Sequence, residues 1–119
     1  MKAPMTMAEA RKNDKGKLMF DLIDPKFEEE IAAVLTFGAR KYAPNNWQHL
    51  KDGTDRHYAA LCRHLNKWRQ GENIDPESKL PHLWHAATNI MFIMHHERPE
   101  NKIAQQEYEH PYGFDEEND

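Results

Sequence analysis

The sequence predicts a small all-α protein, a bundle of three main helices. Three stretches place apolar side chains at helical spacing, and each is bounded by residues that start or stop a helix. The one short run that could form a strand, residues 18–23, has no second strand to pair with. Because 119 residues with 30% charged side chains supply few core residues, we expect a four-helix core completed by oligomerisation, as a homodimer or homotetramer.

The N-terminal part of the chain shows no sustained apolar period. Residues 1–17 are polar and of mixed charge, which indicates a flexible arm. Residues 18–23 are apolar, and we expect them to form an extended segment packed on the helices. This segment opens the helical domain, which we place at residues 18–98.

The first helix is predicted over residues 25–42. Asp24 is suited to the N-cap and Pro25 to the first helical position, and the acidic residues 28–30 lie near the positive end of the helix dipole. Gly38 interrupts the pattern at a cost of roughly 1 kcal/mol relative to alanine. A close helix crossing or the approach of a ligand would explain this glycine.

The second and third helices follow a loop at residues 45–53. The second should begin at Thr54 or Asp55 and end at Gln70, before Gly71, and the third should run from residue 81 to about 97. Residues 72–81 form a connector with two prolines. The predicted core consists of Phe27, Ile31, Val34, Leu35, Leu61, Leu65, Trp68, Leu83, Trp84, Ile90, Met91, Phe92 and Ile93.

The C-terminal residues 99–119 lack an apolar period and predict an acidic tail. Residues 107–119 hold six acidic side chains and no lysine or arginine, so the rest of the chain is slightly basic although the net charge is -4. That balance excludes a duplex nucleic acid as a partner, because non-specific duplex binding needs a far stronger basic surface. It suits a small anionic ligand.

A single cysteine, Cys62, excludes an intrachain disulfide and indicates a reducing compartment. No apolar run reaches the ~20 residues of a membrane span, and the N-terminus lacks a signal-peptide core. We therefore expect a cytoplasmic protein without membrane contact.

The third helix carries a polar stripe in its apolar surroundings. His82, His85 and Asn89 are spaced i, i+3, i+7 and so share one face, and His57 and His64 share a face of the second helix. Such a stripe is either a satisfied hydrogen-bond network or a site. Four histidines on two helices, with carboxylates on a third, favour a site.

Acidic and loop residues could complete that site. Glu28, Glu29 and Glu30 are either a solvated face or ligands for a hard cation such as Mg²⁺, and Glu30 lies nearest the core. The loop after the first helix offers a cation, amides and a ring suited to a nucleotide's phosphates and base. These residues are Lys41, Tyr42, Asn45, Asn46 and Trp47.

The segments GKLMFDLIDP, VLTFGARKYAPNNW, DRHYAALCRHLNKWRQGENIDPES and LPHLWHAATNIMFI resemble the phage-associated dATP/dGTP diphosphohydrolase N-terminal-domain family. The resemblance covers roughly residues 16–96. It implies the fold of the MazG-like all-α pyrophosphohydrolases and a Mg²⁺-dependent enzyme, with Mn²⁺ as an alternative ion. The implied reaction cleaves a purine dNTP to dNMP and pyrophosphate, in the host cytoplasm if the protein is phage-encoded.

The resemblance suggests roles for the candidate residues. Catalysis would fall to Glu30, His85 and Asn89, and the metal ligands would be Glu29, Glu30, His82 and His85. The substrate would be bound by Arg40, Lys41, Asn46, Trp47, Arg56, His57 and His64.

The sequence departs from the wider MazG-like pattern of ExxE on one helix and ExxD on a later one. Ala32 and Ala33 stand where a second acid of the first helix would fall, and His82 and His85 stand where ExxD would align. The alternative hypothesis is therefore a non-catalytic protein of the same fold that sequesters a nucleotide. A third is a small interaction protein that uses its acidic tail.

Overall fold

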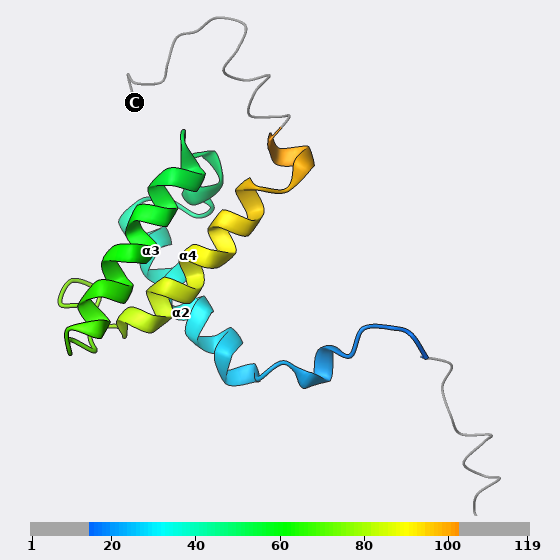
Figure 1. The fold of residues 1–119 in the computed structure, drawn as a ribbon, viewed down its shortest axis with the longest axis horizontal. Coiled ribbons are helices and arrows are strands. Elements are labelled where there is room, and N and C mark those ends of the chain that lie inside the picture. The colour runs from blue at the N-terminus through cyan, green and yellow to red at the C-terminus, as the bar shows by residue number, and fades with distance from the viewer. Residues whose placement is uncertain (1–14, 103–119) are drawn as a thin grey trace, which may run out of the picture.

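Three α-helices carry the fold, in the order α2 (Pro25–Lys41), α3 (Gly53–Arg69) and α4 (His82–His96) (Figure 1). Two short 3₁₀ turns, η1 (Phe20–Leu22) and η2 (Asn46–His49), flank α2 along the chain. The computed structural model describes residues 15–102, and all regular elements in that range are helical. The predicted all-α class is confirmed, and the three predicted helices begin and end within one or two residues of their expected bounds.

Local chemistry explains where the helices begin. The Asp24 carboxylate accepts a hydrogen bond from the Lys26 N–H at 3.0 Å, and Pro25 occupies the first position of α2. Helix α4 starts directly after Pro81 and ends at His96, three residues before Pro99. None of the described helices is long and apolar enough to cross a membrane.

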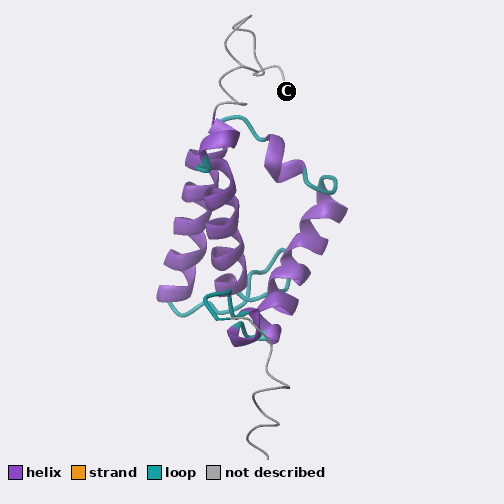
Figure 2. Ribbon diagram, turned by 90° about the vertical axis from the view of Figure 1, so that its right-hand side faces the viewer, coloured by secondary structure: helices purple, strands orange, loops and turns teal. Residues whose placement is uncertain are grey.

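Helices α3 and α4 lie side by side and antiparallel, and α2 packs mainly on α4 (Figures 1 and 2). The first turns of α2 extend away from this pair, and residues 25–29 are exposed. The connector between α3 and α4 is folded against the start of α4. Its Asp75 N–H donates to the Leu80 carbonyl at 2.9 Å, and the His82 N–H donates to the Asn73 carbonyl at 2.8 Å.

The segments before α2 and after α4 differ in how far the structure describes them. The prediction of an extended segment packed on the helices at residues 18–23 was wrong. Residues 20–22 form the turn η1, and the side chains of Leu18, Phe20 and Leu22 are largely exposed. No surface of the described chain covers these side chains, so nothing holds the segment extended. Most of the predicted arm (1–17) and of the predicted acidic tail (99–119) lies outside the described residues.

The predicted apolar core is only partly correct. Val34 and Ala86 are the buried apolar residues of the described chain, whereas Phe27, Leu65, Trp68, Leu83 and Ile90 are 39–48% exposed. Instead, α4 turns its polar stripe inward. The buried polar side chains are His57, His82, His85, Thr88, Asn89 and His96. The interior face of α4 is the one covered by α3 and α2, and the polar stripe lies on that face. Apolar residues such as Leu83 and Ile90 are therefore left on the outer face of α4.

Candidate functional site

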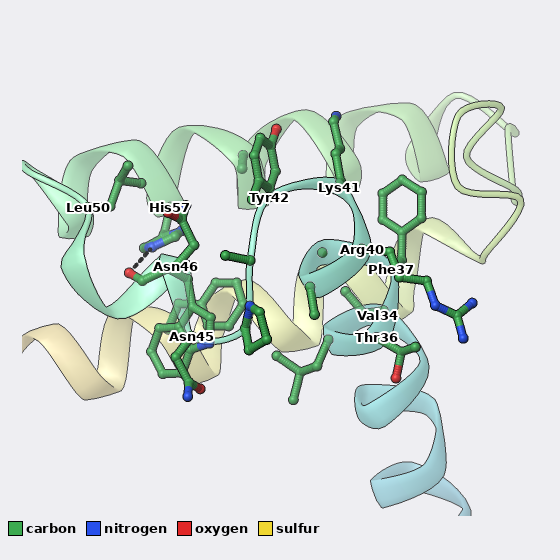
Figure 3. Close-up of a pocket in the computed structure, with 18 of the residues that line it drawn as sticks. Val34, Thr36, Phe37, Arg40, Lys41, Tyr42, Asn45, Asn46, Leu50 and His57 are labelled. Atoms are coloured by element: carbon green, nitrogen blue, oxygen red, sulfur yellow. Dashed lines mark hydrogen bonds between the residues drawn. The ribbon is translucent and has the colours of Figure 1, made fainter. Parts of the chain in front are cut away.

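A pocket of about 900 Å³ lies between the second half of α2, the loop with η2, and α3 (Figure 3). The seven residues predicted to bind substrate come from three separate segments of the chain, and the structure brings all of them to the wall of this pocket. They are Arg40, Lys41, Asn46, Trp47, Arg56, His57 and His64.

The charge of the pocket wall is of one sign. Arg40 and Lys41 end α2, Arg56 and Arg63 lie on one stripe of α3, and no carboxylate lines the pocket. Arg63 was absent from the predicted binding set, although its spacing of seven from Arg56 places both on the same face of a helix. Four cations without an acidic residue make this a pocket for an anion with several charges.

Lys41 also makes a salt bridge with Glu77 of the connector. The hydrogen bond that Lys41 donates to the Glu77 carboxylate raises the pKa of the Lys41 ammonium, which therefore stays charged. Because both side chains are well exposed, this pair adds little stability. An anion in the pocket would compete with Glu77 for Lys41.

Trp47 packs against the helical core and also lines the pocket. Its ring stacks on Phe92 with centroids 4.3 Å apart, and its carbonyl accepts hydrogen bonds from His96 Nε2 at 3.0 Å and His57 Nε2 at 3.4 Å. Burial lowers the pKa of His57, partly offset by the hydrogen bond to Trp47. Trp47 thus fixes the loop, and Tyr42, which is 65% exposed, is the freer ring in the pocket wall.

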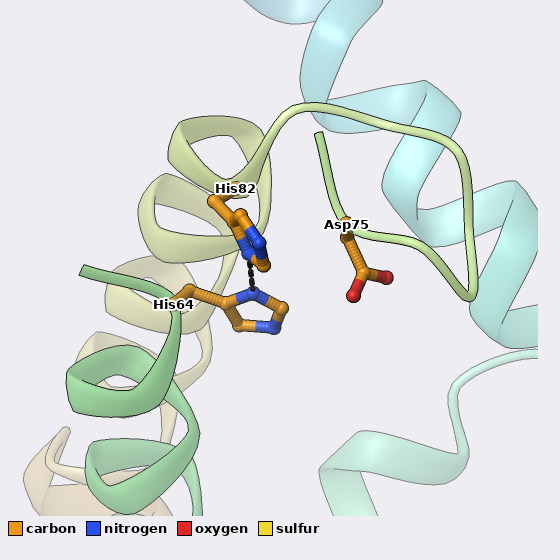
Figure 4. A group of neighbouring side chains, drawn as sticks. All are labelled: His64, Asp75 and His82. Carbon is orange, nitrogen blue, oxygen red and sulfur yellow. Dashed lines mark hydrogen bonds between the residues drawn. The ribbon is translucent and has the colours of Figure 1, made fainter. Parts of the chain in front are cut away.

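A second cluster adjoins the pocket through His64. Ligand atoms of His64 on α3, Asp75 in the connector and His82 at the start of α4 all lie within 4.8 Å of one another (Figure 4). Nδ1 of His64 and Nδ1 of His82 are 2.8 Å apart. We call these three residues the His64–Asp75–His82 cluster.

Neighbouring side chains orient the cluster. His82 Nε2 donates to the Glu72 carboxylate at 2.6 Å, and the Ser78 N–H donates to Asp75 Oδ2 at 3.0 Å. His85 stacks on His64 with parallel rings 4.4 Å apart and contacts the Ser78 hydroxyl at 2.6 Å.

Electrostatics in the cluster follow from burial and from its own charges. Burial and the neighbouring His85 and His82 lower the pKa of His64 to about 4, so His64 is neutral at physiological pH. Burial raises the pKa of Asp75, but the hydrogen bonds from Ser78 together with the nearby His85 and His64 outweigh it, and the net shift is downward. The cluster therefore presents an ionised carboxylate beside a neutral imidazole.

The predicted catalytic and metal residues fall in three places. His82 belongs to the cluster, and His85 lies behind it, with Nε2 3.7 Å from Asp75 Oδ2. Asn89 is buried, and its side-chain amide donates to the His85 carbonyl at 2.9 Å. Glu29 and Glu30 lie on α2, and no group of potential metal ligands in the described chain includes them. Their role stays a prediction.

Sequence reasoning missed Glu72, Asp75 and Ser78 because it treated the connector as a link between helices. The available signal was Asp75-Pro76-Glu77-Ser78 between two histidine-bearing helices. An aspartate followed by proline favours a turn in which the side chain accepts a hydrogen bond from a later N–H. Such a turn fixes a carboxylate near the ends of both helices.

Comparison with known proteins places this chain in a family. The family described as "dATP/dGTP diphosphohydrolase, N-terminal" matches residues 7–106. A protein of Salmonella phage PMBT28, named dATP/dGTP diphosphohydrolase, is 44% identical over 82 residues, which are 69% of this chain and 28% of that protein. The chain thus spans well under half of the length of this relative. No solved structure matches the chain. The chain belongs to the family of dATP/dGTP diphosphohydrolase N-terminal domains.

Proposed function

We propose that the chain binds a purine dNTP in the pocket and hydrolyses it to dNMP and pyrophosphate. The observation that carries this proposal is the set of four cations, Arg40, Lys41, Arg56 and Arg63, around a pocket without a carboxylate. A volume of about 900 Å³ is ample for a nucleotide. The name of the phage relative, dATP/dGTP diphosphohydrolase, supports the same substrate class.

In the proposed reaction a water attacks the α-phosphorus and the bond from the α-phosphorus to the bridging oxygen breaks. Pyrophosphate leaves with the electron pair of that bond, and the water's proton passes to a base or to solvent. Negative charge grows on the leaving group, where arginine and lysine side chains stabilise it most effectively if they are already in place. Arg56 and Arg63 stand on one face of α3, from which both side chains can reach the pocket.

The family resemblance implies Mg²⁺, which prefers oxygen ligands and keeps several waters. A bound divalent cation would neutralise phosphate oxygens and lower the pKa of an attacking water. The potential ligands gathered beside the pocket are two imidazoles and one carboxylate, a set that fits Mg²⁺ poorly. Glu29 and Glu30 remain candidates for Mg²⁺ only together with oxygen ligands that the substrate supplies.

A second function, nucleotide sequestration without hydrolysis, is favoured by two observations. The pocket wall contains no acidic side chain that could act as a general base. The chain also matches only 28% of the phage relative, so residues essential for that protein's activity could lie in its remaining length.

A product assay separates the two functions. The tag-free chain is incubated with each of the four dNTPs and either Mg²⁺ or Mn²⁺, products are resolved by chromatography, and binding is measured in parallel. We expect dNMP and pyrophosphate from dATP and dGTP, with the yield reduced in Arg56→Gln, Glu30→Gln and His85→Ala. Lys67→Gln is the matched control, because it removes a cation of α3 outside the pocket.

Other outcomes decide against hydrolysis. Saturable binding of an intact purine dNTP would establish sequestration. If no dNTP binds, both nucleotide functions are wrong and the interaction-protein hypothesis is left.

A further inference from the structure

We propose that the His64–Asp75–His82 cluster binds a first-row transition-metal ion of the manganese-to-zinc class at the wall of the pocket. Three segments distant in sequence converge to make it: α3, the connector and the start of α4 (Figure 4). Two ligand atoms at about 2.1 Å from one ion lie roughly 3 Å apart when their bonds are perpendicular. The 2.8 Å between the two Nδ1 atoms is close to that separation.

The Glu72 carboxylate provides an independent argument for the ion. Because a carboxylate accepts, His82 must carry a proton on Nε2, and in the neutral ring this leaves the lone pair on Nδ1. That lone pair is aimed at His64, and a ligand atom of Asp75 lies within 4.8 Å (Figure 4). A carboxylate that holds the far nitrogen of a histidine is the usual support of a metal-binding imidazole, since it fixes the tautomer and the ring orientation.

The hydrogen-bonded alternative accounts for less of the geometry. His64 Nδ1–H could donate to His82 Nδ1, and the two rings would then form a simple chain ending at Glu72. That chain leaves the Asp75 carboxylate, which two groups of Ser78 hold beside the histidines, outside the hydrogen bonding of the two rings. An ion uses all three side chains.

The ligand set indicates which class of ion fits. Two imidazole nitrogens and one carboxylate oxygen suit manganese, iron, cobalt or zinc, whereas Mg²⁺ prefers oxygen ligands only. Three protein ligands also leave coordination positions open. His64 lines the pocket, so those positions would face the phosphates of a nucleotide there, a placement that rests on the proposed function.

Ion binding is measured directly and without nucleotide, so that it can fail independently of the proposed function. The tag-free chain is stripped with a chelator and titrated by calorimetry with Zn²⁺, Co²⁺ and Mg²⁺, and the visible absorption of bound Co²⁺ reports its ligands. We expect one Zn²⁺ or Co²⁺ per chain, with Mg²⁺ bound at least about 100-fold more weakly.

Variants locate the ion. Asp75→Asn and His64→Ala should abolish the Co²⁺ absorption, and Glu72→Gln, which keeps the side-chain shape, should weaken affinity about 10- to 100-fold. His49→Ala removes an exposed imidazole outside the cluster and should change nothing. Circular dichroism checks that each variant is folded, and Glu72→Gln decides the question if the others are not.

Three results would overturn the proposal. They are the absence of saturable Zn²⁺ or Co²⁺ binding, binding that Asp75→Asn and Glu72→Gln leave unchanged, and Mg²⁺ affinity equal to that of Zn²⁺.

Discussion

Histidine side chains of α3 and α4 fill part of the interior, where most helical bundles place leucine. Four histidines in the part of the chain that the structure describes are buried, and each has a polar partner, as His57 has the Trp47 carbonyl and His82 has Glu72. A buried neutral imidazole is tolerated when it is hydrogen-bonded, but its protonated form is not. Burial lowers the pKa of His57 and of His85, so stability should depend on pH through these two side chains.

His57 gives the clearest pH prediction. Burial, His96 and Arg56 lower its pKa below 6.5, while the Trp47 carbonyl and the Asn89 side chain partly offset this. Below pH 6.5 the unfolded chain binds the proton more readily, so stability is full above pH 6.5 and falls as the pH drops towards the folded-state pKa. The contribution of His57 to the free energy of unfolding should fall by at most about 1.4 kcal/mol for each pH unit of acidification.

Urea unfolding at pH 7.5 and pH 5.5 tests this prediction. The difference in unfolding free energy between the two pH values should be smaller in His57→Gln, which keeps a donor for the Trp47 carbonyl, than in the parent chain. An equal difference in both proteins would mean that His57 does not contribute.

Arg63 tests the charge of the pocket at a single position. In Arg63→Gln a charged hydrogen bond to phosphate is lost, so dGTP affinity should fall by about 1.5–3 kcal/mol, or roughly 10- to 150-fold. Lys67→Gln removes the same charge one turn further along α3, outside the pocket, and should cost far less. Equal losses in titration calorimetry would show that only the overall charge of α3 matters.

At the scale of elements, local sequence determines where the helices begin and end. Contacts between elements determine which residues are buried and which form the site. Asp24, Pro25, Gly71 and Pro99 announce helix ends in the sequence, and the observed ends lie beside them. The connector was predicted to be a simple link between helices. Its Asp75 carboxylate meets His64 and His82 only because α3 and α4 become neighbours in the fold. The inward direction of the polar stripe on α4 also depends on which face α3 covers.

The two helical glycines test element packing. A side chain at Gly53 would collide with the His96 ring, whereas nothing lies within 4 Å of a methyl group added at Gly38. Gly53→Ala should therefore destabilise the protein by about 1–3 kcal/mol. Gly38→Ala should stabilise it by about 0.4–1 kcal/mol, because it restricts the unfolded chain.

Gly38 has a second readout. The structure shows no close helix crossing there, so of the two explanations for this glycine the approach of a ligand is left, and Gly38 does line the pocket. Gly38→Ala should thus raise the melting temperature and weaken dGTP binding. Higher stability with unchanged dGTP affinity would mean that the ligand does not approach α2 at this point.

At the scale of the whole molecule, α4 is apolar on the side that faces away from its buried stripe. Leu83, Ile90 and Met94 follow one another at helical spacing and are 43–60% exposed. Tyr58 and Leu65 are likewise exposed on α3. A second copy of the chain covering these side chains would supply the four-helix core that the sequence predicts.

Ile90→Glu tests this assembly. We expect the parent chain to be a dimer or tetramer by light scattering, and Ile90→Glu to be monomeric, because a charge cannot be buried unpaired at the interface. Lys67→Glu is the control, since Lys67 lies on the side of α3 opposite Tyr58 and Leu65. A monomeric parent chain would contradict the prediction.

The proposed function depends above all on the pocket as the binding site of a triphosphate. A crystal structure of the chain with an α,β-imido analogue of dGTP, which resists cleavage at the scissile bond, tests this most directly. We predict the triphosphate between Arg40 and Lys41 on one side and Arg56 and Arg63 on the other, with its α-phosphate nearest His64. Density for the analogue anywhere else on the chain would contradict the account.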